Sequence, residues 1–211
     1  MTRQFEGLEV EVRVSPRARR ARIVVAPGKP LQVVVPRRQR VDVDALLDGH
    51  RDWIARHVSR WEAAPRLGLS GSVWVEGARV ALPPRVVDGA ALERWYRREA
   101  RRLLEPVLSR EAERLGLGYA SVSIRAQRTR WGSCSSRGAL SFNWRLAMAP
   151  PRVLEYVAVH ELCHLRESNH SKRFWSHLGR ARPGWRADAG WLRVHGWELL
   201  AYEPDSVFQR L

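Results

Sequence analysis

Residues 160–170 read HELCHLRESNH, and the first five, from His160 to His164, fit the pattern H-E-x-x-H. Residues four apart lie about one turn apart on one face of a helix, so His160 and His164 can present their imidazoles to a single ion. Catalytic zinc takes three protein ligands and leaves one position for water. Glu161 lies beside the ion without binding it and can accept a proton from this water. The pattern predicts one Zn²⁺ site with Glu161 as its base.

The third ligand depends on how the chain leaves this helix, and His170 is the nearest candidate. A continued helix would place His170 about 120° from the face that His160 and His164 share, so the chain must turn. Asn169 enters the left-handed region at modest cost, and we expect it to end the helix and return His170 to the metal. Ser171 then caps a new helix. Cys163 points away from the metal face and is not expected to be a ligand.

The sequence around this stretch favours a helix from about Pro151 to Glu167. Pro150 and Pro151 suit a helix start, and apolar residues give the segment a buried side.

Five motifs match a known family in order: RWGSCSS at 130–136, NWRL at 143–146, YVAVHELCHL at 156–165, NHS at 169–171 and FW at 174–175. With them the chain closely resembles the YgjP-like family of metal-dependent hydrolases and, more distantly, the SprT-like metalloproteases. The resemblance implies a zincin-like catalytic domain with His160, His164 and His170 as ligands and Glu161 as base. Metzincins share the histidine spacing but turn at a glycine where this chain has Glu167, so the backbone path must differ.

The resemblance also implies a substrate cleft. In zincins the edge strand before the active helix pairs with an extended substrate, and by likeness residues 139–143 are the candidate. Arg130, Trp131 and Asn143 are the side chains expected near the cleft. Arg130 could hold a carboxylate or phosphate, polarise the reacting oxygen, or form a structural salt bridge.

The length of 211 residues allows one or two domains. We divide the chain into a β-rich subdomain with one helix, residues 1–85, and a catalytic domain, residues 86–211, which together form an α+β protein. Alternating and apolar runs in 8–14, 23–25 and 31–35 predict a small N-terminal antiparallel sheet with a turn at 27–30, followed by a helix from Asp42 or Asp44 to about Trp61. A hairpin at Glu76-Gly77 and a helix over 90–115, kinked or divided at Pro106, come next.

Composition bounds the location and partners. No apolar run is long enough to span a membrane and the start lacks a signal peptide's apolar region, so we expect a cytoplasmic protein with Cys134 and Cys163 as free thiols. The net charge is +15, and all but two of the 37 basic residues are arginine. Both contact with nucleic acid or nucleotides and a merely solvated basic surface remain open.

The sequence thus favours a zinc-dependent hydrolase that cleaves a peptide bond in a peptide or protein substrate. The alternatives are a metal-dependent nucleoside triphosphate pyrophosphohydrolase and a DNA-associated, SprT-like protease or binding module. His177 and His195 are spare imidazoles with no assigned role.

Overall fold

The computed structural model describes residues 3–25, 30–62 and 71–208, and the side chains of residues 60–62 are left aside. Contacts divide the chain into two compact units, Met1–Pro65 and Arg66–Leu211. The hairpin that the sequence assigned to the N-terminal subdomain belongs to the second unit, because the backbone N–H groups of Glu76 and Gly77 donate to the carbonyls of Ala147 and Met148. Among the described residues, none of the helices has the length and hydropathy that crossing a membrane requires.

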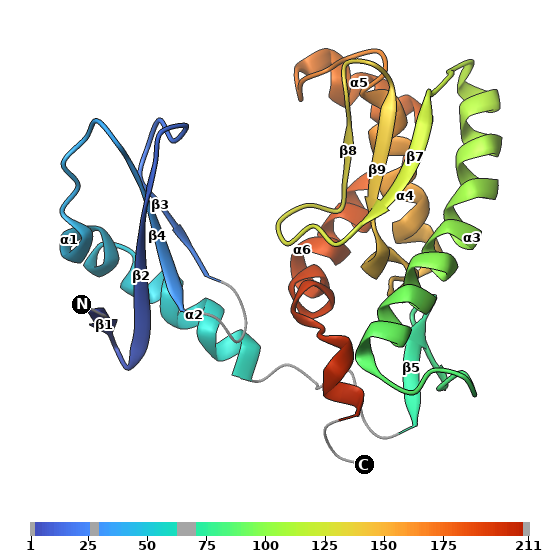
Figure 1. Cartoon of the computed structure of the whole chain (residues 1–211). Helices are drawn as coiled ribbons and strands as arrows, with labels where there is room; N and C mark the ends of the chain where they lie inside the picture. The colour runs from blue at the N-terminus through green and yellow to red at the C-terminus, as the bar shows by residue number, and fades with distance from the viewer. Residues whose placement is uncertain (1–2, 26–29, 63–70, 209–211) are drawn as a thin grey trace. The chain divides into compact units, whose positions relative to one another are not determined.

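Unit 1 is a four-stranded sheet with two helices (Figure 1). Its elements are β1 (Arg3–Phe5), β2 (Leu8–Ser15), β3 (Arg22–Val24), β4 (Leu31–Pro36), α1 (Val43–Asp48) and α2 (Arg51–Glu62). The strand order is β1-β2-β4-β3, and β2 runs parallel to β4. The sheet is therefore mixed, and the prediction of an antiparallel sheet was wrong.

The reason lies in β4, whose residues are nearly all buried. A strand buried on both faces takes the middle of a sheet. β3 pairs with one side of β4 and runs antiparallel to it. β2 pairs with the other side of β4 and runs parallel to it. Apart from Pro30, the turn predicted at 27–30 lies outside the described residues.

Two helices stand where one was predicted. Asp42 caps α1 by accepting hydrogen bonds from the N–H groups of Asp44 and Ala45, as the sequence indicated. The helix ends at Asp48 with Gly49 as its C-cap, and α2 starts at Arg51. Glycine has the lowest helix propensity after proline, which explains the break.

Unit 2 contains a hairpin, a three-stranded sheet and four α-helices among the described residues. Its strands are β5 (Ser72–Val75), β6 (Ala78–Ala81), β7 (Ser121–Arg125), β8 (Gly132–Cys134) and β9 (Ala139–Asn143). Its helices are α3 (Gly89–Leu115), the 3₁₀ helix η1 (Trp144–Met148), α4 (Pro151–Cys163), α5 (Lys172–Ala181), α6 (Trp185–Ala201) and the 3₁₀ helix η2 (Pro204–Val207). Pro106 lies inside α3, which is not divided there.

The three-stranded sheet has the order β7-β9-β8. β9 pairs with β7 in parallel and with β8 antiparallel, so both of its edges are occupied. Residues 139–143 are therefore not the edge strand that the sequence analysis expected. The edge strand beside α4 is β8.

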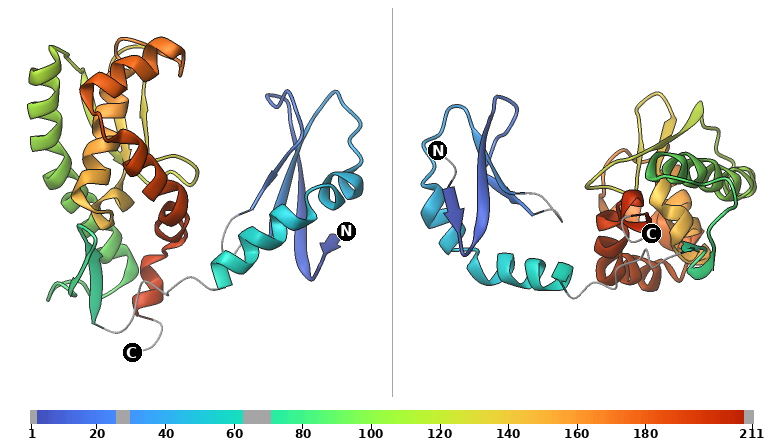
Figure 2. Two further views of the ribbon diagram at one scale, coloured as in Figure 1. Left: turned by 180° about the vertical axis from the view of Figure 1, so that it is seen from behind. Right: turned by 60° about the horizontal axis from the view of Figure 1, so that its bottom comes forward.

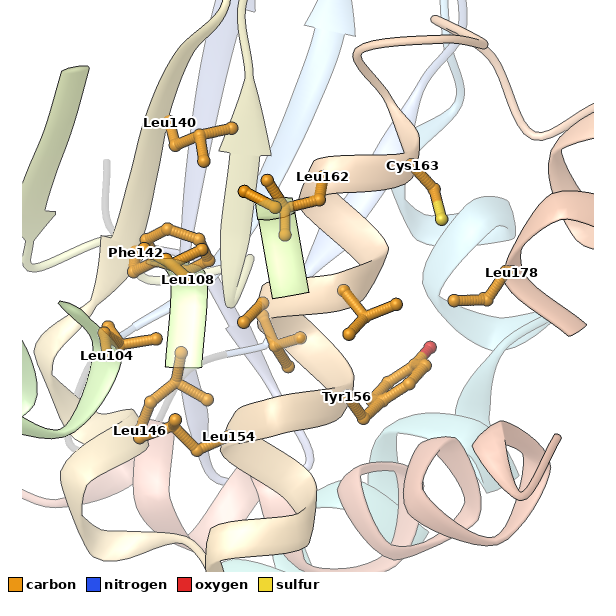
Figure 3. Packing of buried hydrophobic residues seen from close by; sticks show 14 of the residues in the cluster. Leu104, Leu108, Leu140, Phe142, Leu146, Leu154, Tyr156, Leu162, Cys163 and Leu178 are labelled. Atoms are coloured by element: carbon orange, nitrogen blue, oxygen red, sulfur yellow. The ribbon is translucent and has the colours of Figure 1, made fainter. Parts of the chain in front are cut away.

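Helix α4 is buried on nearly all sides. Apolar side chains of α3 and β9, among them Leu108 and Phe142, pack against Leu154 and Leu162 of α4 (Figure 3). Fully burying such a side chain contributes about 1.5 to 3 kcal/mol, so this packing fixes where α4 lies.

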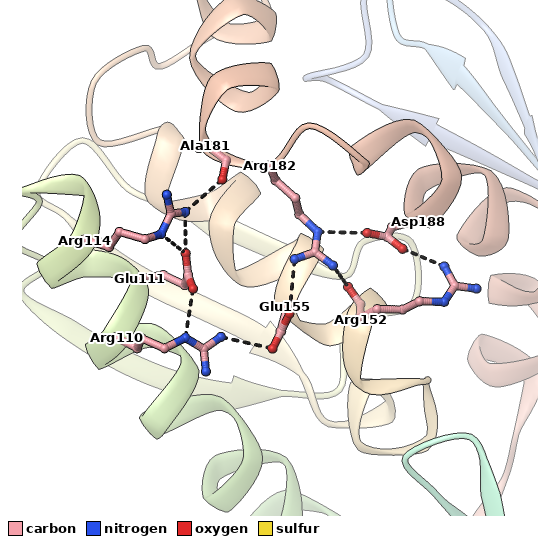
Figure 4. A network of polar contacts seen from close by, with 8 residues as sticks. All are labelled: Arg110, Glu111, Arg114, Arg152, Glu155, Ala181, Arg182 and Asp188. Carbon is pink, nitrogen blue, oxygen red and sulfur yellow. Dashed lines mark hydrogen bonds and ion pairs between the residues drawn. The ribbon is translucent and has the colours of Figure 1, made fainter.

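A network of ion pairs fastens α4 to its neighbours (Figure 4). Glu155 of α4 pairs with Arg110 of α3 at 3.0 Å and with Arg182 at 3.1 Å. Arg182 and Arg152 both bind Asp188 of α6, at 2.8 and 2.6 Å. The carboxylate of Asp188 is almost fully buried and is satisfied by two guanidinium groups, so the network holds three helices together.

Candidate metal centre

The histidines of the H-E-x-x-H motif lie at the end of α4. Pro151 occupies the first helical position, where its missing N–H costs nothing, and Pro150 precedes it. The helix ends at Cys163 with His164 as its C-cap, so His160 and His164 sit one turn apart at the last turn. The rest of the helix packs in the hydrophobic core. The backbone that carries these two imidazoles is therefore held rigidly.

The chain returns His170 to them through a short turn. Backbone hydrogen bonds from Leu165 and Arg166 tighten the end of α4, and the Oδ1 of Asn169 accepts a hydrogen bond from the N–H of Ser171. Asn169 is not left-handed, because among the described residues other than glycine only Glu6 and Glu76 have positive φ. That part of the prediction was wrong, since α4 ends before Glu167 and the chain has more residues in which to turn.

Ser171 then starts α5, as predicted. Its Oγ accepts a hydrogen bond from the N–H of Phe174 at 3.3 Å. This cap fixes the backbone immediately after His170.

The three imidazoles converge. One nitrogen from each of His160, His164 and His170 lies within 4.8 Å of the others, and the Nε2 atoms of His160 and His170 are 3.0 Å apart. The Nδ1 of His164 lies 2.9 Å from the carbonyl oxygen of Glu167. A proton on this Nδ1 satisfies the carbonyl and leaves the Nε2 lone pair free for a ligand.

Desolvation favours the neutral form of two of these imidazoles, those of His160 and His170. Desolvation, aided by the neighbouring His164 and His170, lowers the pKa of His160 to about 3. Desolvation and His164 also lower the pKa of His170. Neutral imidazole is the form that binds metal.

Phe174 is fully buried and touches all three imidazoles. Its ring centroid lies 4.9, 4.4 and 4.8 Å from those of His160, His164 and His170. The phenyl ring thus supports the rings from one side and offers no atom that competes for a metal.

Glu161 lies beside the three imidazoles and is 5% exposed. Burial raises the pKa of its carboxyl to about 7, and the positive charge of Arg130 opposes this rise. The carboxylate has room because Gly132 of β8 faces it without a side chain. A carboxyl group with a pKa near 7 can both accept and release a proton at neutral pH.

A cavity of about 410 Å³ opens over these groups. Arg130, Trp131 and β8 line it together with His160, Glu161, His164 and His170. The structure thus brings together every predicted site residue except Asn143.

Asn143 lies away from the cavity and is 0% exposed. Its side-chain amide donates to the carbonyls of Gln127 and Arg130, and its Oδ1 accepts from the N–H of Arg145. No donor or acceptor of this side chain faces a substrate, so the expected substrate contact is wrong. Asn143 instead holds in place the segment that carries Arg130 and Trp131.

Gly132 and Tyr156 are among the residues of the cavity wall that sequence reasoning missed. Tyr156 lies one turn before His160 on the same face of α4, and this spacing could have identified it. Cys134 also lines the cavity, whereas His177 and His195 do not. His177 contacts Arg180, and His195 lies 3.8 Å from Glu198.

Part of the chain is similar to known proteins. Residues 81–195 match the family described as YgjP-like, metallopeptidase domain. A solved structure, the metallopeptidase zymogen of Pyrococcus abyssi abylysin, is similar at 26% identity over 44% of this chain and 92% of that chain, with a TM-score of 0.39. No curated protein matches.

Proposed function

This chain belongs to the YgjP-like metallopeptidase family, which makes it a metal-dependent hydrolase, and from that premise we propose that it is a zinc peptidase. His160, His164 and His170 bind one zinc ion, and Glu161 is the base. The observation that carries the proposal is the approach of three imidazole nitrogens to within 4.8 Å of one another beside a buried carboxylate, at the floor of an open cavity.

The donor set suits zinc. Three neutral nitrogen ligands with no fourth protein ligand in the group are typical of catalytic rather than structural zinc. The carbonyl of Glu167 supplies the outer partner that orients a ligating histidine. Bound zinc acts as a Lewis acid and lowers the pKa of water to about 7.

Glu161 moves the proton. Its carboxylate accepts a proton from the attacking water and then delivers it to the nitrogen of the leaving amine. Its raised pKa supports both steps, because neither the ionised nor the protonated form is strongly disfavoured near neutral pH.

The substrate lies along β8 rather than β9. One edge of β8 pairs with β9, and no strand of the described residues pairs with its other edge. An extended peptide that adds to this edge forms backbone hydrogen bonds regardless of its side chains. Because Gly132 faces Glu161, a peptide on this edge lies close to the base.

The side chain of Arg130 is placed to contact an oxygen atom of the substrate. It is exposed, lines the cavity and forms no ion pair within the described ranges. Its guanidinium can stabilise the oxyanion that develops on the scissile carbonyl. The same feature also fits phosphates, so a nucleoside triphosphate pyrophosphohydrolase is the second candidate.

The test is a substrate screen of the zinc-loaded protein with casein-derived labelled peptides and, separately, nucleoside triphosphates. Glu161→Gln should retain zinc and lose peptide cleavage, His164→Ala should lose both, and the control His177→Ala should lose neither. Release of pyrophosphate without peptide cleavage would establish the second candidate instead. Peptide cleavage that persists in Glu161→Gln would refute the role of the base.

A further inference from the structure

Two turns at one end of the unit 1 sheet carry six arginines. They are Arg17, Arg19 and Arg20 after β2, and Arg37, Arg38 and Arg40 after β4. β2 and β4 are parallel neighbours whose last residues, Ser15 and Pro36, are in register. Both turns therefore lie at the same end of the sheet (Figures 1 and 2).

A hydrogen bond joins the turns directly. The backbone N–H of Arg37 donates to the carbonyl of Ser15 at 3.3 Å, and the N–H of Ala18 donates to the same carbonyl. Neighbouring strands lie about 4.8 Å apart, so the two sets of arginines form one surface, which we call the arginine end.

The carboxylates that follow the arginine end in the sequence are engaged elsewhere, since Asp42 caps α1 and Asp44 pairs with Arg3. All six residues are exposed, and within the described parts of the chain none forms an ion pair with a carboxylate. Residues 12–41 contain neither aspartate nor glutamate. A concentration of one charge sign without internal partners attracts counterions or a polyanion.

The parallel pairing creates this concentration. Had these strands paired antiparallel in chain order, β3 would stand between β2 and β4, and the two turns would lie one strand further apart. The sheet topology therefore brings together two groups of arginines that are separate in the sequence.

We propose that the arginine end binds the phosphate backbone of duplex nucleic acid without reading its sequence. A guanidinium group presents a planar fork of donors that matches phosphate oxygens. Six such groups on two adjacent turns can contact several phosphates of one duplex at once. The site lies in unit 1 and is independent of the function proposed for the cavity of unit 2.

The other residues of these turns favour a duplex over a lipid surface or a single strand. They are proline, alanine and glutamine, and neither turn contains an aromatic residue. Membrane-surface elements insert bulky apolar side chains, and single-strand binding sites stack bases on aromatic rings. Contact with phosphates alone needs neither.

The experiment is a fluorescence-anisotropy titration of the full chain with a short labelled duplex DNA, repeated from about 50 to 200 mM salt. One variant carries Arg17→Gln, Arg19→Gln and Arg20→Gln, and a second carries Arg37→Gln, Arg38→Gln and Arg40→Gln. The matched control removes three arginines of unit 2 that are likewise exposed and without an ion pair in the described ranges, by Arg85→Gln, Arg94→Gln and Arg98→Gln.

Each arginine-end variant should bind at least about tenfold more weakly and lower the slope of log K against log salt by about 2 to 3, because each lost phosphate contact removes about 0.9 from the slope. The control should bind like the unaltered chain. Equal losses in all three variants, or no binding at the lowest salt, would overturn the proposal. Tighter binding to anionic vesicles or to polyglutamate, with the same dependence on these arginines, would overturn it in favour of those partners.

Discussion

Gly132 and Glu161 are in contact across the cavity floor, and there is no room between them for a side chain. A Cβ placed on Gly132 would lie 2.6 Å from both the Cγ and the Oε1 of Glu161. Real Cβ atoms do not approach other atoms so closely, so the glycine is required by the position of the base. Since β8 carries Gly132 and α4 carries Glu161, the edge strand and the active helix depend on each other.

Gly132→Ala should therefore remove activity while leaving the ligands in place. The carboxylate must move by about 1 Å, and a displacement of that size in a catalytic group costs about 10²-fold in rate. Peptide-cleavage rates and zinc content of the same preparation measure the two effects. Gly118→Ala is the matched control, since nothing lies within 4 Å of a Cβ there and its φ is not positive. Full activity of Gly132→Ala would contradict the placement of Glu161 as base.

Ser171→Ala should loosen the third ligand. The variant loses the side-chain cap of α5, which costs about 1 kcal/mol, and leaves His170 with a less fixed backbone. Zinc affinity, measured by competition with a chromophoric chelator, should fall several-fold. Asp88→Ala removes the corresponding cap of α3, bonded to Ala91, and should lower stability without lowering zinc affinity. Equal affinities of the two variants would show that the cap does not position His170.

How far the sequence predicts this molecule can be judged at individual residues. The start of α4 at Pro151, the cap at Ser171 and the hairpin at Glu76-Gly77 follow from local rules, since each depends on residues within one turn of the chain. The parallel pairing of β2 with β4 and the central place of β9 do not. Alternating hydrophobicity defines a strand and its buried face, but the pattern does not determine which other strand pairs with it.

The candidate site shows the same division. The spacing of His160 and His164 follows from helix geometry, whereas the contact of Gly132 with Glu161 joins residues from different elements. Asn143 was misplaced for this reason: an asparagine beside a predicted cleft has the same sequence signature whether its amide faces a substrate or the backbone of residues 127 to 130.

Low pH should lower the stability of unit 2 by protonating the carboxylate of Glu111. Burial alone would raise the pKa of this carboxyl, but hydrogen bonds from Arg114 and Arg110 outweigh burial and lower it below its ordinary value. A depressed pKa stabilises the fold above the unfolded-state pKa of about 4.3, and this stabilisation is lost as the pH falls through the folded-state value.

Glu111→Gln should consequently cost about 1 to 2 kcal/mol of unfolding free energy at pH 7 and progressively less below pH of about 4. The free energies of unfolding of the variant and of the unaltered chain are measured by urea denaturation at pH 7 and at the lower pH, and their difference at each pH gives the cost. Glu113→Gln changes an exposed carboxylate of the same helix and should have little effect at either pH. A cost that is independent of pH would show that the ion pairs of Glu111 are not its source.

Asn143→Leu should act on the fold rather than on substrate affinity. The leucine has a similar volume but leaves the carbonyls of Gln127 and Arg130 and the N–H of Arg145 without the partner they have now. Each unsatisfied buried group costs about 1 to 3 kcal/mol, so the variant should unfold at a clearly lower urea concentration. As the 127–131 segment loosens, Arg130 and Trp131 lose their fixed positions, and kcat should fall more than KM rises. The opposite result, unchanged stability with a KM increased about tenfold, would mean that Asn143 contacts the substrate directly, at a cost of about 1.4 kcal/mol in binding.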